Sequence, residues 1–477
     1  MKTTSKLCAL ALAAFLVAGG AAAQVDLSIY VALGDSVTAA YASAGLAKAY
    51  QDTSFPALLA GQFGATGFQQ PTVSNPGIPA VLELKQLVVV NGQVVPVIAA
   101  KSGLGAPTNA TYAGIYANLG IPGARANDLL TKTGDVTRLL TGTSTAATVM
   151  YDIVLRFPVI PGTQVPGTAI NQAIAAHGTF YTVWAGSNDV LGAAVAGVAI
   201  DGVTLTPAAA FQTQYTTLIG AIRQNLPNAK IVVATIPDVT ALPFVTTVKP
   251  YIFTPSGQKV YLLGEAGPLT DSDYVTLGAS ALIQQGYGIP GTGKLLPEGS
   301  FNPATMTLTQ GVILRVQEAN AIRTRTGELN NIVEGVAAST GAAVVDMAQI
   351  FADIGANGYH IGGVTLTTAF LTGGLFSYDG VHPQNLAHAI VANEFIKVIN
   401  SAYGASVPLV NLRPFLTGSA ATTSVLAPQV IFTPEAHRQL LTTLLPDVQL
   451  ANTSTIRPVQ RRLVGSGRPS TGAIVNP

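Results

Sequence analysis

Short apolar runs rich in β-branched residues recur along this chain and alternate with longer segments of helical periodicity. Such runs predict buried strands, because strands covered on both faces are apolar throughout. Strand–helix alternation in turn predicts an α/β fold with a parallel sheet between helical layers. The predicted strands are Ser28–Leu33, Phe180–Trp184, Lys230–Thr235 and Ala342–Met347.

Two long helices are predicted between these strands. In Pro207–Leu226 the apolar residues recur at helical spacing, with Thr206 at the N-cap and Pro207 at the first helical position. Val312–Ser339 is predicted to form the second helix.

Two regions interrupt the alternation and are interpreted as insertions. Residues 75–113 contain "LVVVNGQVVPVI", in which Asn91-Gly92 predicts a hairpin turn between two β-rich runs. Residues 245–311 are rich in glycine, proline and aromatic residues. After residue 404 the chain becomes rich in proline, serine and threonine, with one short helix predicted over Pro434–Leu445. We interpret residues 405–477 as an appendage or partly disordered C-terminal extension.

The amino terminus has the pattern of a secretory signal peptide. Lys2 and Lys6 accompany the apolar run Leu7–Val17, and small residues follow up to Ala23. The expected organisation is therefore a signal peptide over residues 1–23, a domain over residues 24–404 and the extension. We expect a secreted, periplasmic or cell-surface protein.

Composition narrows the classes of partner. The chain has 24 basic and 23 acidic residues, a balance that gives no sign of nucleic-acid binding. Beyond the leader, no run of about 18 apolar residues predicts a membrane-spanning helix. Charged residues make up 10% of the chain, against roughly 25% in ordinary soluble proteins. Such a surface suits peripheral contact with lipid or a cell surface, and it equally suits a merely sticky extracellular protein.

Chemistry is suggested where the first strand ends, at Gly34-Asp35-Ser36. A nucleophilic serine needs a base, a group that orients the base and donors for the oxyanion. In "YDGVHP", Asp379 and His382 lie three residues apart, so one turn can bring the carboxylate to the imidazole. A capping aspartate beside an incidental histidine is the alternative. The remaining histidines are interpreted as packed or surface residues: His177, His360, His388 and His437.

Two further stretches end in turns after strand-like runs. "YANLGIPGARANDLL" contains Asn118 and places Gly123 where a backbone N–H can be exposed. "YTVWAGSNDVLG" continues into Gly186, Asn188 and Asp189. An asparagine amide at a strand's carboxyl end can donate hydrogen bonds into a site there. Either stretch alone could equally be an ordinary turn.

Taken together and in this order, the four stretches resemble the sequence blocks of the SGNH (GDSL-type) hydrolases. The resemblance covers about Leu27 to Tyr403 and excludes the extension. Val37 stands where the family usually has leucine. The resemblance implies a flavodoxin-like three-layer α/β/α sandwich and a lipase or esterase that works through an acyl-enzyme, with no metal or cofactor. Its ester substrate would be a lipid or an acylated carbohydrate.

The resemblance also implies a role for each residue. Ser36 would be the nucleophile, His382 the base and Asp379 the group that orients it. The oxyanion hole would consist of the backbone N–H groups of Ser36 and Gly123 and the side-chain amide of Asn188. Asp35 is expected to be structural.

Two classes of function stay open on the sequence. One is a secreted ester hydrolase; the other is a catalytically idle surface or adhesion protein that keeps the scaffold. The presence of all five site residues in the expected order favours the hydrolase. The rival nucleophile motif Gly-x-Ser-x-Gly does not occur in the chain.

Residues 245–311 are expected at the rim of the active site. They follow a predicted strand whose carboxyl end should lie at the same sheet edge as Ser36. Their aromatic residues suit a mobile cover that binds an acyl chain or a sugar ring. A passive surface loop or small packing subdomain is the alternative.

We predict that the mature protein begins at or near Gln24 and contains no disulfide, because the only cysteine, Cys8, lies within the leader. Intact-mass spectrometry of exported protein checks this. Exported material that retains Cys8 would contradict it.

Overall fold

A parallel sheet forms the centre of the computed structural model, which describes residues 25–90, 92–416 and 429–451 of the chain. Within these residues the sheet has five strands in the order β15-β6-β5-β1-β4. The chain therefore builds the sheet outward from β1 in both directions, which is the flavodoxin-like arrangement. The strands are β1 (Tyr30–Gly34), β4 (Asn118–Gly120), β5 (Phe180–Trp184), β6 (Lys230–Ala234) and β15 (Ala343–Val345).

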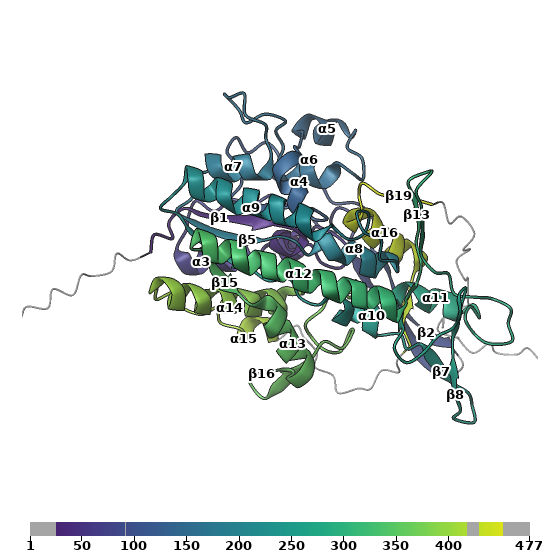
Figure 1. Cartoon of the computed structure of the whole chain (residues 1–477). Coiled ribbons are helices and arrows are strands. Elements are labelled where there is room, and N and C mark those ends of the chain that lie inside the picture. Colours follow the sequence, from purple (N-terminus) through teal and green to yellow (C-terminus); the bar gives the residue numbers. More distant parts are fainter. Residues whose placement is uncertain (1–24, 91, 417–428, 452–477) are drawn as a thin grey trace, which may run out of the picture.

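Helices cover both faces of this sheet, which confirms the predicted α/β sandwich (Figure 1). Successive residues of a strand point to opposite faces. In β1, Val31 and Leu33 pack into one core, whereas Tyr30 and Ala32 pack into a second core. The first core lies under α4 (Ala126–Thr131), α7 (Ala169–Ala175), α9 (Ala208–Asn225) and α12 (Val316–Thr340), and the second under α3 (Phe55–Phe63) and α14 (Asn385–Tyr403).

The long helices begin slightly later than the sequence predicts, because neighbouring elements use the residues before them. Thr206 does not cap α9; its hydroxyl donates to Asp189 Oδ1 (2.6 Å), and Pro207 is the N-cap. The predicted helix at 312 starts at Val316, since Ile313–Leu314 form β14 and pair with β11 (Tyr274–Val275).

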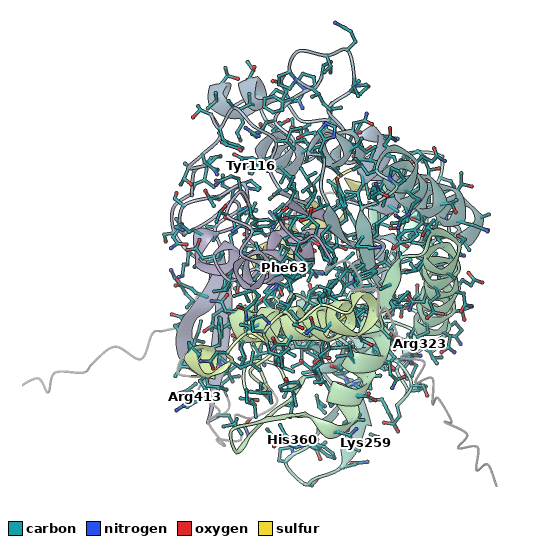
Figure 2. The ribbon with its side chains drawn as sticks, turned by 90° about the vertical axis from the view of Figure 1, so that its left-hand side faces the viewer. Phe63, Tyr116, Lys259, Arg323, His360 and Arg413 are labelled. Atoms are coloured by element: carbon teal, nitrogen blue, oxygen red, sulfur yellow. The ribbon has the colours of Figure 1, made fainter. Side chains whose placement is uncertain are left out.

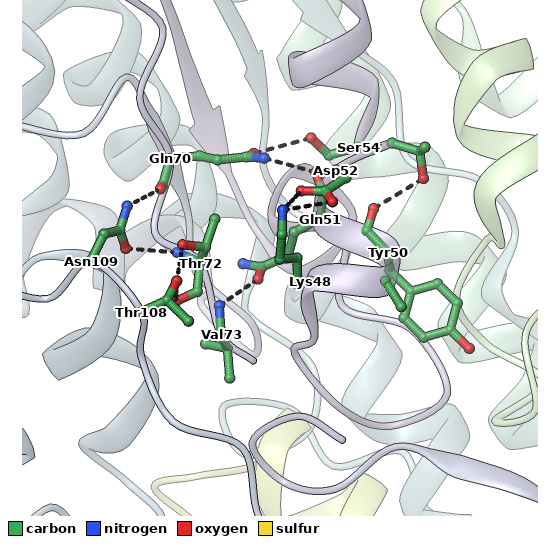
Figure 3. A network of polar contacts seen from close by, with 12 residues as sticks. Lys48, Tyr50, Gln51, Asp52, Ser54, Gln70, Thr72, Val73, Thr108 and Asn109 are labelled. Carbon is green, nitrogen blue, oxygen red and sulfur yellow. Dashed lines mark hydrogen bonds and ion pairs between the residues drawn. The ribbon is translucent and has the colours of Figure 1, made fainter. Parts of the chain in front are cut away.

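The first insertion forms the predicted hairpin of β2 (Leu82–Val90) and β3 (Gln93–Ala100). Asn91 of the predicted turn lies outside the described residues. The flanks of the insertion are fixed by side-chain amides (Figure 3). Gln51 of α2 (Lys48–Gln51) donates to Pro71 O (2.6 Å) and accepts from Val73 N (2.8 Å). Asn109 donates to Gln70 O (2.9 Å), which ties the far end of the insertion to its start.

The second insertion consists of short paired strands around a small core of its own. It lies at the end of the molecule that carries Lys259, opposite the end that carries Tyr116 (Figure 2). Its elements are β7 (Tyr251–Phe253), β8 (Lys259–Tyr261), β9 (Leu263–Gly264), β10 (Gly267–Pro268), β11, α11 (Ser280–Ile283), β12 (Ser300–Asn302) and β13 (Thr307–Thr309), with a 3-10 turn at Leu277–Ala279.

The described part of the C-terminal extension is built into the domain, so our interpretation of an appendage is wrong for residues 429–451. β18 (Ile431–Phe432) pairs with β3, and β19 (Gln449–Leu450) pairs with β13. Between them, α16 (Pro434–Leu444) buries one apolar face in the main core, because Ala436, Leu440, Leu441 and Leu444 repeat at helical spacing. The helix predicted over Pro434–Leu445 is thus confirmed, but composition did not show that it packs into the main core.

The remaining elements are short or connect the layers. None of the helices within the described residues is long and apolar enough to cross a membrane. The predicted signal peptide, residues 1–23, lies outside the described residues. The short or connecting elements are α1 (Ser36–Ala39), α5 (Val136–Thr141), α6 (Val149–Val154), α8 (Asn188–Ala196), α10 (Pro243–Thr246), α13 (Met347–Asn357), α15 (Arg413–Leu416), β16 (Tyr359–Ile361), β17 (Val364–Leu366) and a 3-10 turn at Val239–Ala241.

Candidate active site

Ser36 is the first residue of α1, two positions after the carboxyl end of β1. Asp35 is the N-cap and accepts a hydrogen bond from Val37 N (3.0 Å), which starts the helix immediately after the strand. Gly34 is required because a Cβ there would lie 2.3 Å from both Thr38 Oγ1 and Trp184 O. The turn therefore holds Ser36 at the carboxyl edge of the sheet, as predicted, with only 2% of its surface exposed.

Asp379 and His382 lie in a compact loop before α14. Ser377 N donates to His382 O (2.9 Å), and Gly380 N donates to Ser377 O (3.0 Å), so residues 377–382 close on themselves. Both side chains are buried. The predicted spacing thus does bring the carboxylate to the imidazole.

A continuous line of hydrogen bonds joins the three predicted triad residues. His382 Nδ1 lies 2.8 Å from Asp379 Oδ2, and His382 Nε2 lies 3.0 Å from Ser36 Oγ. An ionised carboxylate can only accept, so Nδ1 carries the imidazole proton. Nε2 then has its lone pair directed at the serine hydroxyl, which is the arrangement that general-base catalysis requires.

The carboxylate of Asp379 is fully supplied with donors. Oδ1 accepts from Ser377 Oγ (3.0 Å), Val381 N (2.8 Å) and His382 N (2.9 Å). Oδ2 accepts from Ala44 N (2.7 Å) as well as from the imidazole. Burial would by itself raise the pKa of Asp379, but the charge of His382 and these hydrogen bonds outweigh burial and lower it. Asp379 therefore stays ionised while it orients His382.

The three predicted oxyanion donors follow neighbouring strands. Gly34 of β1 is paired with Gly120 of β4 and with Trp184 of β5, so the segments that carry Ser36, Gly123 and Asn188 leave the sheet side by side. Asn188 Nδ2 donates one hydrogen to Ala124 O (2.9 Å), and this bond links the segment that follows β5 to the segment that follows β4. Within the described residues no acceptor is recorded for Ser36 N, Gly123 N or the second hydrogen of Asn188 Nδ2. All three residues are buried.

The other candidate residues have structural partners. Asp189 is buried and accepts from Thr206 Oγ1 (2.6 Å) and Ala126 N (3.1 Å), which positions α4 and α9. Asn118 donates to Thr38 O (3.0 Å) behind α1.

The remaining histidines lie apart from the hydrogen-bonded line. His177 and His360 are exposed, and His360 lies at the lower edge of Figure 2. His388 and His437 are buried, and burial lowers their pKa values to about 3 and about 4. The interpretation of these four as packed or surface residues is confirmed.

An apolar cavity of about 130 Å³ opens beside Ser36 and His382. The end of β5, α8 and the segment that follows β6 form part of its wall, and α13 and α14 form another part. The residues that line it include Trp184, Leu191, Pro237, Val239, Leu242, Met347, Ile350, Phe351, Ile354, Leu375, Phe376, Ala387, Ile390 and Val391, with Glu394 as its ionisable residue besides His382.

Residues 245–311 do not line this cavity. Phe301 and Met306 of the insertion line a second cavity that also contains Gly123, and the predicted place of the insertion at the rim of the active site stays a prediction. Residues 237–242, just before the insertion, border the first cavity instead. The insertion packs against the loop 377–382, which carries Asp379 and His382: a Cβ on Gly380 would lie 2.9 Å from Leu277 Cδ1.

Sequence reasoning also missed the residues that surround Asp379. Ala44 N and Ser377 Oγ donate to its carboxylate, and the ring of Tyr41 meets the ring of His382 edge-on with 5.1 Å between centroids. An alanine N–H and a distant tyrosine leave no local signal in a sequence.

The chain matches the family model described as GDSL-like Lipase/Acylhydrolase over residues 30–395. It belongs to this family and is therefore a carboxylic ester hydrolase. The idle-scaffold alternative is set aside. A search of curated proteins found no match.

Solved structures of esterases and lipases are similar at low identity. An acetyl-xylooligosaccharide esterase from Geobacillus is 13% identical, with a TM-score of 0.33 over 78% of this chain and 93% of its own. A lipase/acylhydrolase from Enterococcus faecalis is 12% identical, with a TM-score of 0.31 over 80% and 98%. An extracellular lipase from Streptomyces rimosus is 16% identical, with a TM-score of 0.30 over 78% and 98%.

We predict that Asp35→Asn retains esterase activity and gains relative stability as the pH rises. Burial raises the pKa of Asp35 to about 6, so the folded protein favours its neutral form. A raised carboxyl pKa means that stability is lost as the pH climbs from the ordinary value of 3.8 through 6. In the wild type the free energy of unfolding falls by about 3 kcal/mol by pH 7 for this reason, whereas asparagine does not titrate and the variant shows no such fall.

Urea unfolding of both proteins at pH 4 and pH 7 measures the difference. A constant difference in unfolding free energy, or loss of activity as complete as in Ser36→Ala, would contradict a structural Asp35.

Proposed function

We propose that the enzyme hydrolyses its ester through an acyl-enzyme on Ser36, with His382 as the base and Asp379 as its orienting carboxylate. The observation that carries this proposal is the line of hydrogen bonds from Ser36 Oγ through His382 to Asp379. Ser36 and His382 are 346 residues apart in the chain, so local structure alone does not create it.

The first half of the reaction follows from this geometry. As Ser36 Oγ attacks the ester carbonyl carbon, its proton passes to His382 Nε2. The carbonyl oxygen becomes an oxyanion, which the N–H groups of Ser36, Gly123 and Asn188 stabilise in a buried site. Collapse of this intermediate expels the alcohol, which takes the proton back from His382. The acyl group remains on Ser36.

The second half repeats these steps with water. His382 removes a proton from the water as it attacks the acyl carbon, and the same donors stabilise the second oxyanion. The carboxylic acid leaves and Ser36 Oγ regains its proton. Asp379 keeps its charge throughout, because its donors hold its pKa low.

The cavity supports an ester with an apolar acyl group, and we propose a lipid as the substrate. Aliphatic and aromatic side chains line it, and it lies directly against Ser36 and His382. An acyl chain would replace water there and gain the free energy of apolar burial. An acetyl group, as on an acylated carbohydrate, would leave most of this space unfilled and forfeit those contacts.

We further propose that the enzyme acts outside the cytoplasm. The support for this is the signal-like pattern of residues 1–23, together with a charged fraction of 10%. Cell fractionation with an antibody to the protein tests this location.

Hydrolysis of p-nitrophenyl butyrate should depend on the proposed residues to different degrees. Ser36→Ala and His382→Ala are expected to abolish it. Asn188→Ala should lower kcat by about 10²–10³, because one oxyanion donor of three is lost. Thr217→Ala, on the exposed side of α9, is the matched control. Folded Ser36→Ala that hydrolyses at the wild-type rate would refute the proposal.

Filling the cavity should change the preferred acyl length. Ala387→Leu on α14 places additional methyl groups in the lining. We expect kcat/KM for p-nitrophenyl octanoate to fall at least about 10-fold, because a pocket discriminates by roughly this factor per unaccommodated group. The acetate ester should be hydrolysed nearly as before.

Ala352→Leu is the control, because it adds the same group to the exposed side of α13. An unchanged ratio of octanoate to acetate in Ala387→Leu would show that the acyl chain binds elsewhere.

A further inference from the structure

The loop 40–44, which connects α1 to α2, has an unusual backbone. Ala40, Ser43 and Ala44 all have positive φ angles, of 54°, 52° and 55°. Residues with a Cβ adopt this left-handed conformation at a cost in free energy, so it persists only where the surroundings hold it. Strained backbone of this kind often marks functional sites.

This loop supplies part of the environment of the triad. Ala44 N donates to the same Asp379 oxygen that accepts from His382 Nδ1. Tyr41, from the same loop, places its ring edge-on to His382. Ser43 N donates to Ser377 Oγ (2.8 Å), which itself donates to Asp379. Displacement of the loop would therefore move the carboxylate and the imidazole.

The C-terminal helix α16 holds the loop through two side chains. Gln439 Nε2 donates to Ala44 O (2.7 Å) and to Ala80 O (2.8 Å). Thr443 Oγ1 accepts from Tyr41 OH (3.0 Å), and both partners of this bond are buried. Each contact spans about 400 residues of sequence.

The end of α16 also touches the proposed oxyanion hole. A Cβ on Gly123 would lie 2.1 Å from the carbonyl oxygen of Thr443. Gly123 therefore has the last turn of α16 directly against it. One helix thus contacts both the support of the triad and a donor of the oxyanion hole.

We propose that Gln439 and Thr443 of α16 are positioning residues for the reaction. This helix lies outside residues 30–395, over which the chain matches its family. The inference rests on the proposed roles of Ser36, His382 and Asp379. It assigns the C-terminal segment a function in turnover, beyond completing the core.

Two substitutions in the full-length protein test the proposal. Thr443→Val keeps the shape of the side chain but removes the acceptor of the Tyr41 hydroxyl. Gln439→Met keeps the length of the side chain but removes both donated hydrogen bonds. We expect each to lower kcat on p-nitrophenyl butyrate about 10-fold or more with KM within about 2-fold, because misplaced catalytic groups slow chemistry without weakening substrate binding.

Matched variants separate positioning from simple stability. Thr443→Ser restores the hydroxyl and should restore kcat. Ala436→Gly weakens the same helix without removing a hydrogen bond, so it should lower the melting temperature and leave kcat unchanged. If Thr443→Val does not fold, Tyr41→Phe removes the same bond from the donor's side and should show the same loss of kcat.

Wild-type kcat in folded Thr443→Val and Gln439→Met, with Ser36→Ala inactive, would overturn the inference and leave the proposed function intact. An equal loss of kcat in Ala436→Gly would also overturn it, because destabilisation would then suffice. Hydrolysis by Ser36→Ala would instead refute the proposed function itself.

Discussion

The hydrogen bonding of the buried Asp379 carboxylate is the interaction on which the site depends. An ion removed from water in this way is tolerated only when hydrogen bonds replace its hydration. Here five donors surround it, three on Oδ1 and two on Oδ2. Three of these five come from His382 and its neighbour Val381, so satisfying the charge also orders the loop that carries the base. The hydrogen bonds that stabilise the charge of Asp379 are therefore also the ones that fix the backbone around His382.

The parallel sheet supplies the rest of the geometry. Because parallel strands end at one edge, residues that follow β1, β4 and β5 meet without any contact between their sequences. This edge collects Ser36, Gly123 and Asn188, while the loop before α14 brings Asp379 and His382 over it. The apolar cavity beside Ser36 is lined by residues of α13 and α14, and Thr443 of α16 lies directly against Gly123. The site is thus built from the whole length of the domain.

Much of this could be predicted from the sequence, because the signals are local. Strand runs such as Phe180–Trp184 are recognisable by composition, and Asp379 and His382 lie within one turn of each other. The rest depends on contacts that no local pattern records. The N–H of Ala44 reaches Asp379 across 335 residues, and Gln439 reaches Ala44 across 395. The helix α16 was predicted from its own sequence, but its packing into the main core was not, because composition does not record which surface an amphipathic helix contacts.

Trapping the acyl-enzyme tests the central claim most directly. The protein is incubated with a p-nitrophenyl phosphonate ester carrying an octyl chain, which forms a stable covalent adduct on an activated serine. Peptide mass spectrometry then locates the adduct. The account predicts one adduct, on Ser36, formed with loss of hydrolytic activity and absent from His382→Ala. An adduct on another residue with parallel loss of activity, or full inhibition without modification of Ser36, would contradict it.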